Sequence, residues 1–520
     1  MIVVRTSGYL FDHQIRYPIW EASNRQLSHW LETLNLGGVI LLGGSAAELL
    51  LKTQQLQKWS KTPLFIAADI EEGVGQRFSG ATNFPPPMAL GEIAKSDLPL
   101  AVKYAYQMGE VTAKEALAMG INWILSPLVD VNNNPDNPVI NIRSFGDSPQ
   151  IVSELGKAFI EGAKNYPTLT TAKHFPGHGD TSSDSHLDLP IINHDNERLE
   201  GLELVPFQAA INANVDSVMT AHLLINAWDK KNPATLSKAI LTGKLREKLG
   251  FNGLIVTDAL IMGGVTKFAD SEEISVKGVE AGADILLMPD DPEIAISSVY
   301  NAVKTGRLTV ERIDESLNRI WEAKQTIFNS QNKNISIYQL SQKSDRETVK
   351  NILRDSLKTS NNLPLKVTDN TAKRNLIVVD DILNADFLDR QMPAFTIPNL
   401  LGYNLQLVDQ KTFSNILEEE QETLLQIFIR GNPFRGNSGF NETVKKYYHK
   451  LLNKSIVKGL IIYGSPYILD WFTTEINLEI PWVFSYGQMA ESQAIACQTL
   501  FNLSTAELRK MSKNLGDVFI

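Results

Sequence analysis

The chain has 520 residues, which is too long for one ordinary hydrophobic core, so we expect two domains. Hydrophobic residues make up 43% of it and charged residues 21%, the profile of a soluble globular protein rather than a disordered one. The formal net charge of -10 argues against a nucleic acid or an acidic membrane surface as the partner.

The single cysteine, Cys497, excludes an intramolecular disulfide and suits a reducing compartment. The first twenty residues carry charged side chains, among them Asp12, where a signal peptide would need an unbroken apolar core. No run approaches the roughly 20 apolar residues of a membrane-spanning helix. We therefore expect a cytoplasmic protein.

Residues 1–330 alternate short apolar runs with longer helical stretches, which is typical of βα units around a parallel sheet. A weak segment near 3–11 supplies one candidate strand. The clear strands follow at 38–42 (GVILL), 64–68 (LFIAA), 122–126 (NWILS), 170–174 (TTAKH), 217–221 (SVMTA), 254–257 (LIVT) and 284–288 (DILLM). Eight such units predict an α/β fold of the (β/α)8 TIM-barrel type with insertions.

Residues 331–372 are rich in Asn, Ser, Lys and Gln, and we interpret them as a helical connector followed by a linker. Strand-like runs resume in residues 373–520, at 375–379 (NLIVV), 424–429 (LLQIFI), 459–463 (GLIIY) and 481–485 (PWVFS). They predict a smaller α/β sandwich domain. Because no phosphate-binding glycine pattern opens this region, it offers little support for nucleotide binding.

Polar side chains stand at or just after the carboxyl ends of several predicted barrel strands. They are Asp69, His174, His222 and Asp258. In a barrel these ends converge on one mouth, where active sites are built. Asp258 could simply cap the next helix, but a carboxylate ending a buried strand is costly unless it meets partners or a polar pocket.

The densest group of reactive side chains is the segment KHFPGHGDTSSDSH at 173–186. It holds three of the chain's eight histidines, and Pro176, Gly177 and Gly179 force an irregular loop. Zinc could be bound by its histidines with Asp180 or Asp184, but the spacing matches no HExxH pattern and Lys173 would place a positive charge beside the metal.

A proton-transfer pair is the alternative interpretation of the same loop. Asp184 can orient the ring of His186 and raise its basicity, which leaves the second ring nitrogen for proton transfer. A serine hydrolase would use such a pair too, but the chain has no GxSxG nucleophile elbow. Elsewhere at the predicted mouth, Asp69, Arg77 and Arg143 could bind vicinal sugar hydroxyls through paired hydrogen bonds.

Together these residues resemble glycoside hydrolase family 3, specifically its bacterial β-N-acetylglucosaminidases. KHFPGHG with a downstream DSH is the most specific element. The other matching stretches are DIEEGVGQRF at 69–78, SPLVDVNNNPDNPVINIRSFGDSP at 126–149, MTAHLLI at 219–225, LIVTDALIMGG at 254–264 and AGADILLMP at 281–289. Three features depart from the family pattern: DIEEG stands for the usual DQEGG, the first strand is degenerate, and the second domain matches weakly.

The resemblance implies a role for each matching position. Asp258 matches the nucleophile, His186 the general acid/base and Asp184 its partner. The positions that hold the sugar are matched by Asp69, Arg77, Arg143, Lys173 and His174. A retaining hydrolysis of terminal β-linked N-acetylglucosamine would follow, and a neutral base also leaves phosphorolysis open.

We expect a small carbohydrate or muropeptide as substrate, consistent with cell-wall recycling, and no metal or other cofactor. The sequence leaves three alternatives open: a family 3 β-glucosidase or broader exo-glycosidase, a catalytically inactive sugar-binding protein, and a zinc hydrolase. It does not indicate an oligomeric state.

Overall fold

The computed structural model describes residues 1–17, 20–182, 184–185, 187–329, 335–367, 372–416, 421–430, 442–474 and 479–511. The chain forms two compact units, Met1–Thr348 and Val349–Ile520. In the described part, no helix is both long and apolar enough to cross a membrane.

The first unit is built on eight parallel strands. They are β1 (Ile2–Ser7), β2 (Gly38–Leu42), β4 (Phe65–Ala68), β6 (Trp123–Ile124), β7 (Thr171–Phe175), β9 (Ser217–Thr220), β11 (Leu254–Val256) and β12 (Leu286–Leu287). Two ladders, β12-β1-β2-β4-β6 and β11-β9-β7, are joined at both ends by the parallel bridges Trp123↔Leu169 and Val256↔Ile285. The strands thus close into a ring, which confirms the predicted barrel, its degenerate first strand included.

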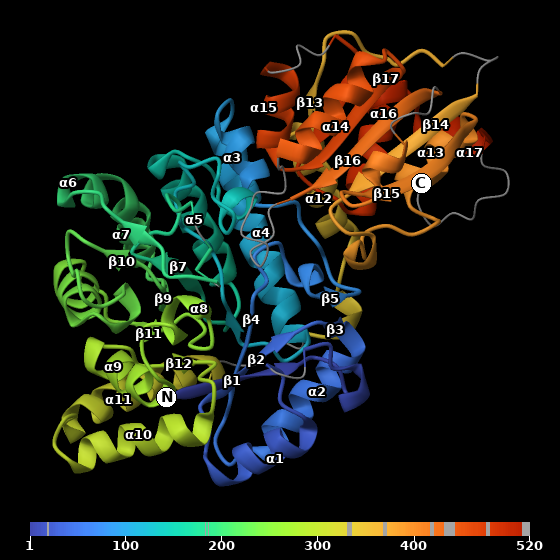
Figure 1. Ribbon diagram of the computed structural model, residues 1–520. Helices are drawn as coiled ribbons and strands as arrows, with labels where there is room; N and C mark the ends of the chain where they lie inside the picture. The colour runs from blue at the N-terminus through green and yellow to red at the C-terminus, as the bar shows by residue number, and fades with distance from the viewer. Residues whose placement is uncertain are drawn as a thin grey trace. The chain divides into compact units, whose positions relative to one another are not determined.

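Helices alternate with these strands along the chain (Figure 1). They are α1 (Asn24–Thr33), α2 (Ala46–Trp59), α3 (Met88–Ala94), α4 (Leu98–Ala118), α5 (Pro149–Ala163), α6 (Asn196–Arg198), α7 (Leu204–Asn212), the π-helix η6 (Ala239–Lys248), α8 (Gly263–Thr266), α9 (Ser271–Ala281), α10 (Pro292–Lys304) and α11 (Val310–Phe328). Two short parallel pairs, β3 (Gly44–Ser45) with β5 (Phe78–Ser79) and β8 (Ile191–Ile192) with β10 (Leu224–Ile225), lie in the loops.

The barrel interior is filled by alternate residues of the strands. Val3, Ile40, Ala67, Met219, Val256 and Leu287 belong to one buried cluster. Within it, the indole Nε1 of Trp123 donates to the hydroxyls of Thr171, at 2.9 Å, and Ser217, at 3.0 Å. Successive side chains of a strand face opposite sides of the sheet. The residue two positions beyond each of these interior residues, toward the carboxyl end of the strand, therefore also faces inward and lies nearer the barrel mouth.

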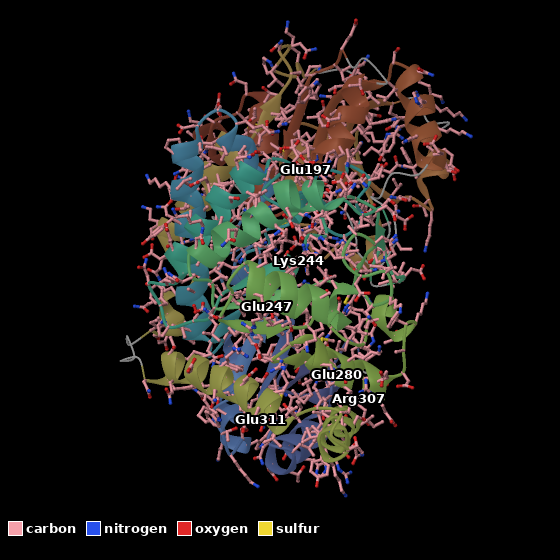
Figure 2. The ribbon with its side chains drawn as sticks, turned by 90° about the vertical axis from the view of Figure 1, so that its left-hand side faces the viewer. Glu197, Lys244, Glu247, Glu280, Arg307 and Glu311 are labelled. Atoms are coloured by element: carbon pink, nitrogen blue, oxygen red, sulfur yellow. The ribbon has the colours of Figure 1, made fainter. Side chains whose placement is uncertain are left out.

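The outer face of the barrel helices carries charged side chains. Figure 2 shows Glu280 of α9 beside Arg307, whose Nε lies 2.7 Å from the Glu280 carboxylate. A second carboxylate, Glu273, lies 2.7 Å from the same guanidinium. Exposed pairs of this kind contribute little stability, so burial of the apolar face of each helix is what holds it on the barrel.

The second unit contains a six-stranded sheet in the order β13-β18-β17-β16-β14-β15. Its strands are β13 (Lys358–Thr359), β14 (Lys373–Val379), β15 (Tyr403–Asp409), β16 (Glu422–Ile429), β17 (Val457–Gly464) and β18 (Trp482–Ser485). All pair in parallel except β13, which is antiparallel to β18. Its helices are the part of α12 (Lys343–Asp355) that follows Thr348, and α13 (Pro393–Leu400), α14 (Glu442–Asn453), α15 (Pro466–Thr474), α16 (Ala490–Phe501) and α17 (Thr505–Met511).

Four strands of this sheet lie where the sequence predicts them, and two do not. The edge strand β15 escapes prediction because YNLQLVD mixes polar and apolar residues and most of its side chains are only partly covered. The two-residue strand β13 lies inside the segment interpreted as a connector. The proposed connector at 331–372 includes residues 331–334 and 368–371, which lie outside the described residues.

Lys324 of α11 is a buried charge whose removal is expected to stabilise the first unit. Its ammonium lies 5.0 Å from the centre of the Phe65 ring, the side chain is only 4% exposed, and burial lowers its pKa to about 8. Below pH 8 the folded state bears the full cost of the buried charge, which fades as the pH rises toward the ordinary value of 10.5. We expect Lys324→Met to raise the free energy of unfolding by roughly 1–3 kcal/mol at pH 7.

Urea unfolding at pH 7 and pH 10 measures the effect, and the advantage of the variant should shrink at the higher pH. Lys304→Met, at an exposed position of α10, is the matched control and should leave the unfolding midpoint unchanged. A variant as stable as the wild type at pH 7 would contradict the inference that the buried charge of Lys324 destabilises the folded state.

Candidate active site

The candidate site residues gather at the carboxyl ends of the barrel strands. Asp69 directly follows β4, Lys173 and His174 belong to β7, and Asp258 lies two residues beyond β11. Arg143 ends a short 3-10 helix, η3 (Asn141–Arg143), in the loop after β6. The closed barrel brings these loops to one mouth.

A buried carboxylate, Glu71, is at the centre of an ion network on one side of the mouth. Arg143 donates to it in bidentate fashion, from Nε at 2.8 Å and Nη2 at 2.7 Å. The Nζ of Lys173 lies 2.6 Å from Glu71 and 2.7 Å from Asp69. Lys173 is only 1% exposed, whereas the Asp69 carboxylate is 34% exposed. Asp69 is therefore the most exposed member of the network, ahead of Arg143 at 19%.

Opposite charges in the network outweigh the effect of burial on the pKa values of Glu71 and Lys173. Burial alone would raise the pKa of Glu71, but the charges of Arg143 and Lys173 hold it well below its ordinary value. Burial alone would lower the pKa of Lys173, but the carboxylates of Asp69 and Glu71 raise it. The result is a fixed set of ions suited to paired hydrogen bonds with vicinal hydroxyls.

A second buried carboxylate, Asp130, anchors the start of the loop at 173–185. It accepts hydrogen bonds from the backbone N–H of His174 at 3.1 Å, from His178 N–H at 2.7 Å, and lies 2.8 Å from His174 Nδ1. Gly179 lets the loop approach closely here, since a Cβ on it would lie 1.7 Å from the Val131 carbonyl oxygen. The glycine of this motif is thus required for packing.

His178 holds the far part of the same loop. Its Nδ1 lies 2.9 Å from the Thr181 hydroxyl and its Nε2 lies 2.8 Å from the Ser185 hydroxyl. Burial lowers the pKa of His178 to about 4, so the ring is neutral at pH 7 and both nitrogens serve these hydroxyls. Among the described residues, no group of three or more His, Cys, Asp or Glu side chains is arranged to hold a metal.

Asp258 lies on the opposite side of the barrel from Asp69. Its backbone N–H donates to Thr220 Oγ1 at 3.4 Å, and one carboxylate oxygen accepts from the Ala259 N–H at 2.7 Å. Its negative charge raises the pKa of His178, against the larger effect of burial. Asp258 therefore lies within electrostatic range of the loop at 173–185.

Asp184 is buried, with its backbone carbonyl accepting from the N–H groups of Leu187 and Asp188 at 3.0 Å each. Its neighbour Ser185 is tied to His178. His186, the predicted acid/base, lies outside the described residues, so its role stays a prediction.

The structure brings Asp69 and Lys173 into direct contact and links Arg143 to Lys173 through the Glu71 carboxylate that both cations contact. Arg77 lies beside Asp69, with its Nε donating to the Asp69 carbonyl oxygen at 3.2 Å. Sequence reasoning missed three groups that organise the site: Glu71, Asp130 and His178. All three lie inside the sequence stretches quoted above. Only burial in a closed barrel shows that they act as internal partners.

The sequence profile described as the glycosyl hydrolase family 3 N terminal domain matches residues 10–323. The chain belongs to glycoside hydrolase family 3. A second profile, the bacterial glycosyl hydrolase family 3 C-terminal domain, matches residues 366–502. The resemblance found in the sequence motifs is thereby confirmed, and it extends to the weakly matching second domain.

Several family 3 proteins are similar to this chain. "Beta-hexosaminidase A" of Pseudoalteromonas piscicida is 35% identical over 330 residues, covering 58% of this chain and 55% of that protein. A family 3 β-N-acetylglucosaminidase of Paenibacillus sp. str. FPU-7 has a structure similar to this one, with a TM-score of 0.79, 27% identity and coverage of 96% and 95% of the two chains.

NagZ of Neisseria gonorrhoeae, solved with N-trifluoroacetyl-D-glucosamine, gives a TM-score of 0.55 and 28% identity, over 67% of this chain and 96% of that one. In sequence, the chain spans about half the length of the first curated relatives it matches.

Glu71→Gln tests the ion network. Arg143 and Lys173 would lose the carboxylate that they share, and we expect the free energy of unfolding to fall by about 3–5 kcal/mol at pH 7. The contribution of Glu71 is complete above its ordinary pKa of 4.5 and declines as the pH falls from there through its lower folded-state value. The gap between variant and wild type should therefore narrow below pH 4.5.

Chemical denaturation at several pH values measures this gap. Glu161→Gln, at an exposed position 3.9 Å from Lys157, is the matched control and should change stability by less than about 0.5 kcal/mol. Equal unfolding midpoints for Glu71→Gln and wild type would overturn the assignment of Glu71 as the centre of the network.

Proposed function

We propose that this family 3 chain is an exo-acting β-N-acetylglucosaminidase that releases terminal β-linked N-acetylglucosamine with retention of configuration. One observation carries the proposal: the ion network around Asp69 and the carboxylate of Asp258 lie on opposite sides of one barrel mouth. The names of the similar proteins, β-hexosaminidase and β-N-acetylglucosaminidase, support the choice of sugar.

We propose that the sugar is held by its hydroxyls on the side of the network. Asp69 offers a partly exposed carboxylate whose position is set by the buried ammonium of Lys173. Arg77, Arg143 and His174 complete the group of side chains expected to bind it. A carboxylate beside fixed cations suits a pair of vicinal hydroxyls, because charge-assisted hydrogen bonds are both strong and directional.

The reaction is proposed to proceed in two displacements. The Asp258 carboxylate attacks the anomeric carbon while His186 gives a proton to the departing glycosidic oxygen, so a covalent glycosyl-enzyme forms. His186 then takes a proton from water, which attacks the same carbon and frees Asp258. Asp184 orients the imidazole. A histidine is partly neutral and partly protonated near pH 7, so it can do both tasks without a large pKa shift.

We propose a cytoplasmic role in muropeptide recycling, with N-acetylglucosamine linked to anhydro-N-acetylmuramic acid as substrate. The lone buried thiol of Cys497 is compatible with a reducing compartment. Faster release of N-acetylglucosamine from chitobiose than from the purified muropeptide disaccharide would contradict this role.

Asp258→Ala tests the nucleophile. Without the carboxylate no glycosyl-enzyme can form, so we expect kcat for an aryl β-N-acetylglucosaminide to fall by roughly a thousandfold or more. The melting temperature should stay within a few degrees of wild type. Near-normal turnover would refute the assignment. A wild type that cleaves the aryl β-glucoside better than the N-acetylglucosaminide would instead favour a β-glucosidase.

His186→Ala tests the acid/base. A substrate with a poor leaving group needs protonation as its bond breaks, whereas an activated aryl group does not. We expect the variant to lose roughly 10²–10⁴-fold on N-acetylglucosaminyl disaccharides and much less on the formation of the glycosyl-enzyme from a dinitrophenyl glycoside. Equal losses on both substrates would argue against the acid role.

A further inference from the structure

Arg5 is a charged residue of β1 whose side chain enters the barrel interior. Its neighbour two positions back, Val3, belongs to the buried interior cluster, and Arg5 pairs in register with Ile40 of the same cluster. Because side chains alternate along a strand, Arg5 points inward one step nearer the mouth than Val3.

Arg5 also occupies a particular place around the ring of strands. The strand β1 is separated from β4, which precedes Asp69, by β2 alone, and from β11, which precedes Asp258, by β12 alone. Burial lowers the pKa of Arg5 and Glu21 raises it; to a smaller extent the charge of Asp69 raises this pKa and that of Arg77 lowers it. Around the ring of strands, Arg5 therefore lies between Asp69, on the side of the ion network, and Asp258.

The guanidinium of Arg5 is held in place but only partly hydrogen-bonded. It lies 5.7 Å from the centre of the Tyr17 ring and 5.3 Å from that of Trp20, two rings that stack on each other. Among the described residues its one hydrogen-bond partner is Glu21, which lies 3.4 Å from Nη2. Within the described part of the chain, Nε is buried without an acceptor, whereas Nη1 makes no hydrogen bond and is not one of the buried unpaired atoms.

The loop that carries the two rings is fastened to the neighbouring helices. Asp12 accepts from the Asn24 N–H at 2.9 Å, and the Asn24 side chain donates to the Leu10 carbonyl at 3.0 Å. Gln14 donates to Glu48 of α2 at 3.1 Å. These contacts preorganise the surroundings of Arg5, and preorganised donors bind a ligand at low entropic cost.

We propose that Arg5 is a specificity-determining residue, whose Nη1 donates a hydrogen bond to an oxygen on a substituent of the bound sugar. The inference rests on the proposed function. With hydroxyls held at Asp69 and the anomeric carbon at Asp258, Arg5 faces one of the two ring edges between them. One edge carries the 2-acetamido carbonyl and the other the C6 oxygen. Both are neutral acceptors of the kind that a guanidinium binds.

Three aryl β-glycosides separate the two oxygens. They are the N-acetylglucosaminide, the glucoside, which lacks the acetamido group, and the 6-deoxy-N-acetylglucosaminide, which lacks the C6 oxygen. Arg5→Met keeps an unbranched apolar stem and removes the donors. We expect kcat/KM on the parent to fall by about tenfold or more, and to fall far less on the one analogue that lacks the contacted oxygen.

The analogue whose kcat/KM falls least identifies the edge of the sugar ring that Arg5 contacts. Where the glucoside is turned over too slowly, the inhibition constant of the free sugar replaces kcat/KM. Equal losses on all three substrates, or no loss on the parent, would overturn the inference. If Arg5→Met does not fold, Arg5→Lys keeps the charge but not the planar donor group and should show the same selective loss.

Arg25→Met, at an exposed position of α1, makes the same exchange outside the barrel and should match wild type on every substrate. The proposed function fails separately: a wild type that cleaves none of the three glycosides would refute it. If the wild type is active and Arg5→Met has the same kcat/KM as wild type on all three substrates, only the role of Arg5 is refuted.

Discussion

One buried carboxylate, that of Glu71, joins the ends of three barrel strands. It follows β4 and is shared by Arg143 from the loop after β6 and by Lys173 of β7. Taking such charges out of water is costly, and only close, well-directed partners offset the cost. The three loops are therefore held in one relative arrangement, and the position of Asp69 follows from it because Asp69 shares the same ammonium.

The loop at 173–185 is fixed by the same principle. Asp130 receives donors from both His174 and His178, and His178 in turn engages hydroxyls on either side of Asp184. The carboxylates of Glu71 and Asp130 are thus internal partners rather than groups that face a ligand. A preorganised site of this kind needs little rearrangement when charge develops during a reaction.

Glu71 and Arg5 have different roles: Glu71 holds other side chains in place, whereas Arg5 is proposed to select the substrate. Glu71 has its hydrogen-bonding capacity taken by two cations, so it supports other residues. Arg5 has one partner among the described residues and keeps donors in reserve near the mouth. In a closed barrel, an inward charged residue with unused hydrogen-bond donors is well placed to bind a polar group of a ligand in the mouth.

Much of the fold could be read from the sequence, because buried parallel strands are apolar runs separated by helices. The weak pattern of β1 and the mixed pattern of β15 show where this stops: Arg5 interrupts one strand, and partial solvent exposure blurs the other. The predicted strand ends marked Asp69, His174 and Asp258, but they carried no information on which side chains share partners.

By itself, the sequence determined the family, the barrel and the loop positions of the candidate residues, since hydrophobic periodicity and motifs are local properties of a chain. Only the tertiary structure decided that Glu71 and Asp130 are buried internal partners and that Arg5 reaches the mouth. Contacts such as that between Lys173 and Asp69 join residues far apart in the chain. Barrel closure brings them within hydrogen-bonding distance, and the neighbouring carboxylates offset the effect of burial on the pKa of Lys173.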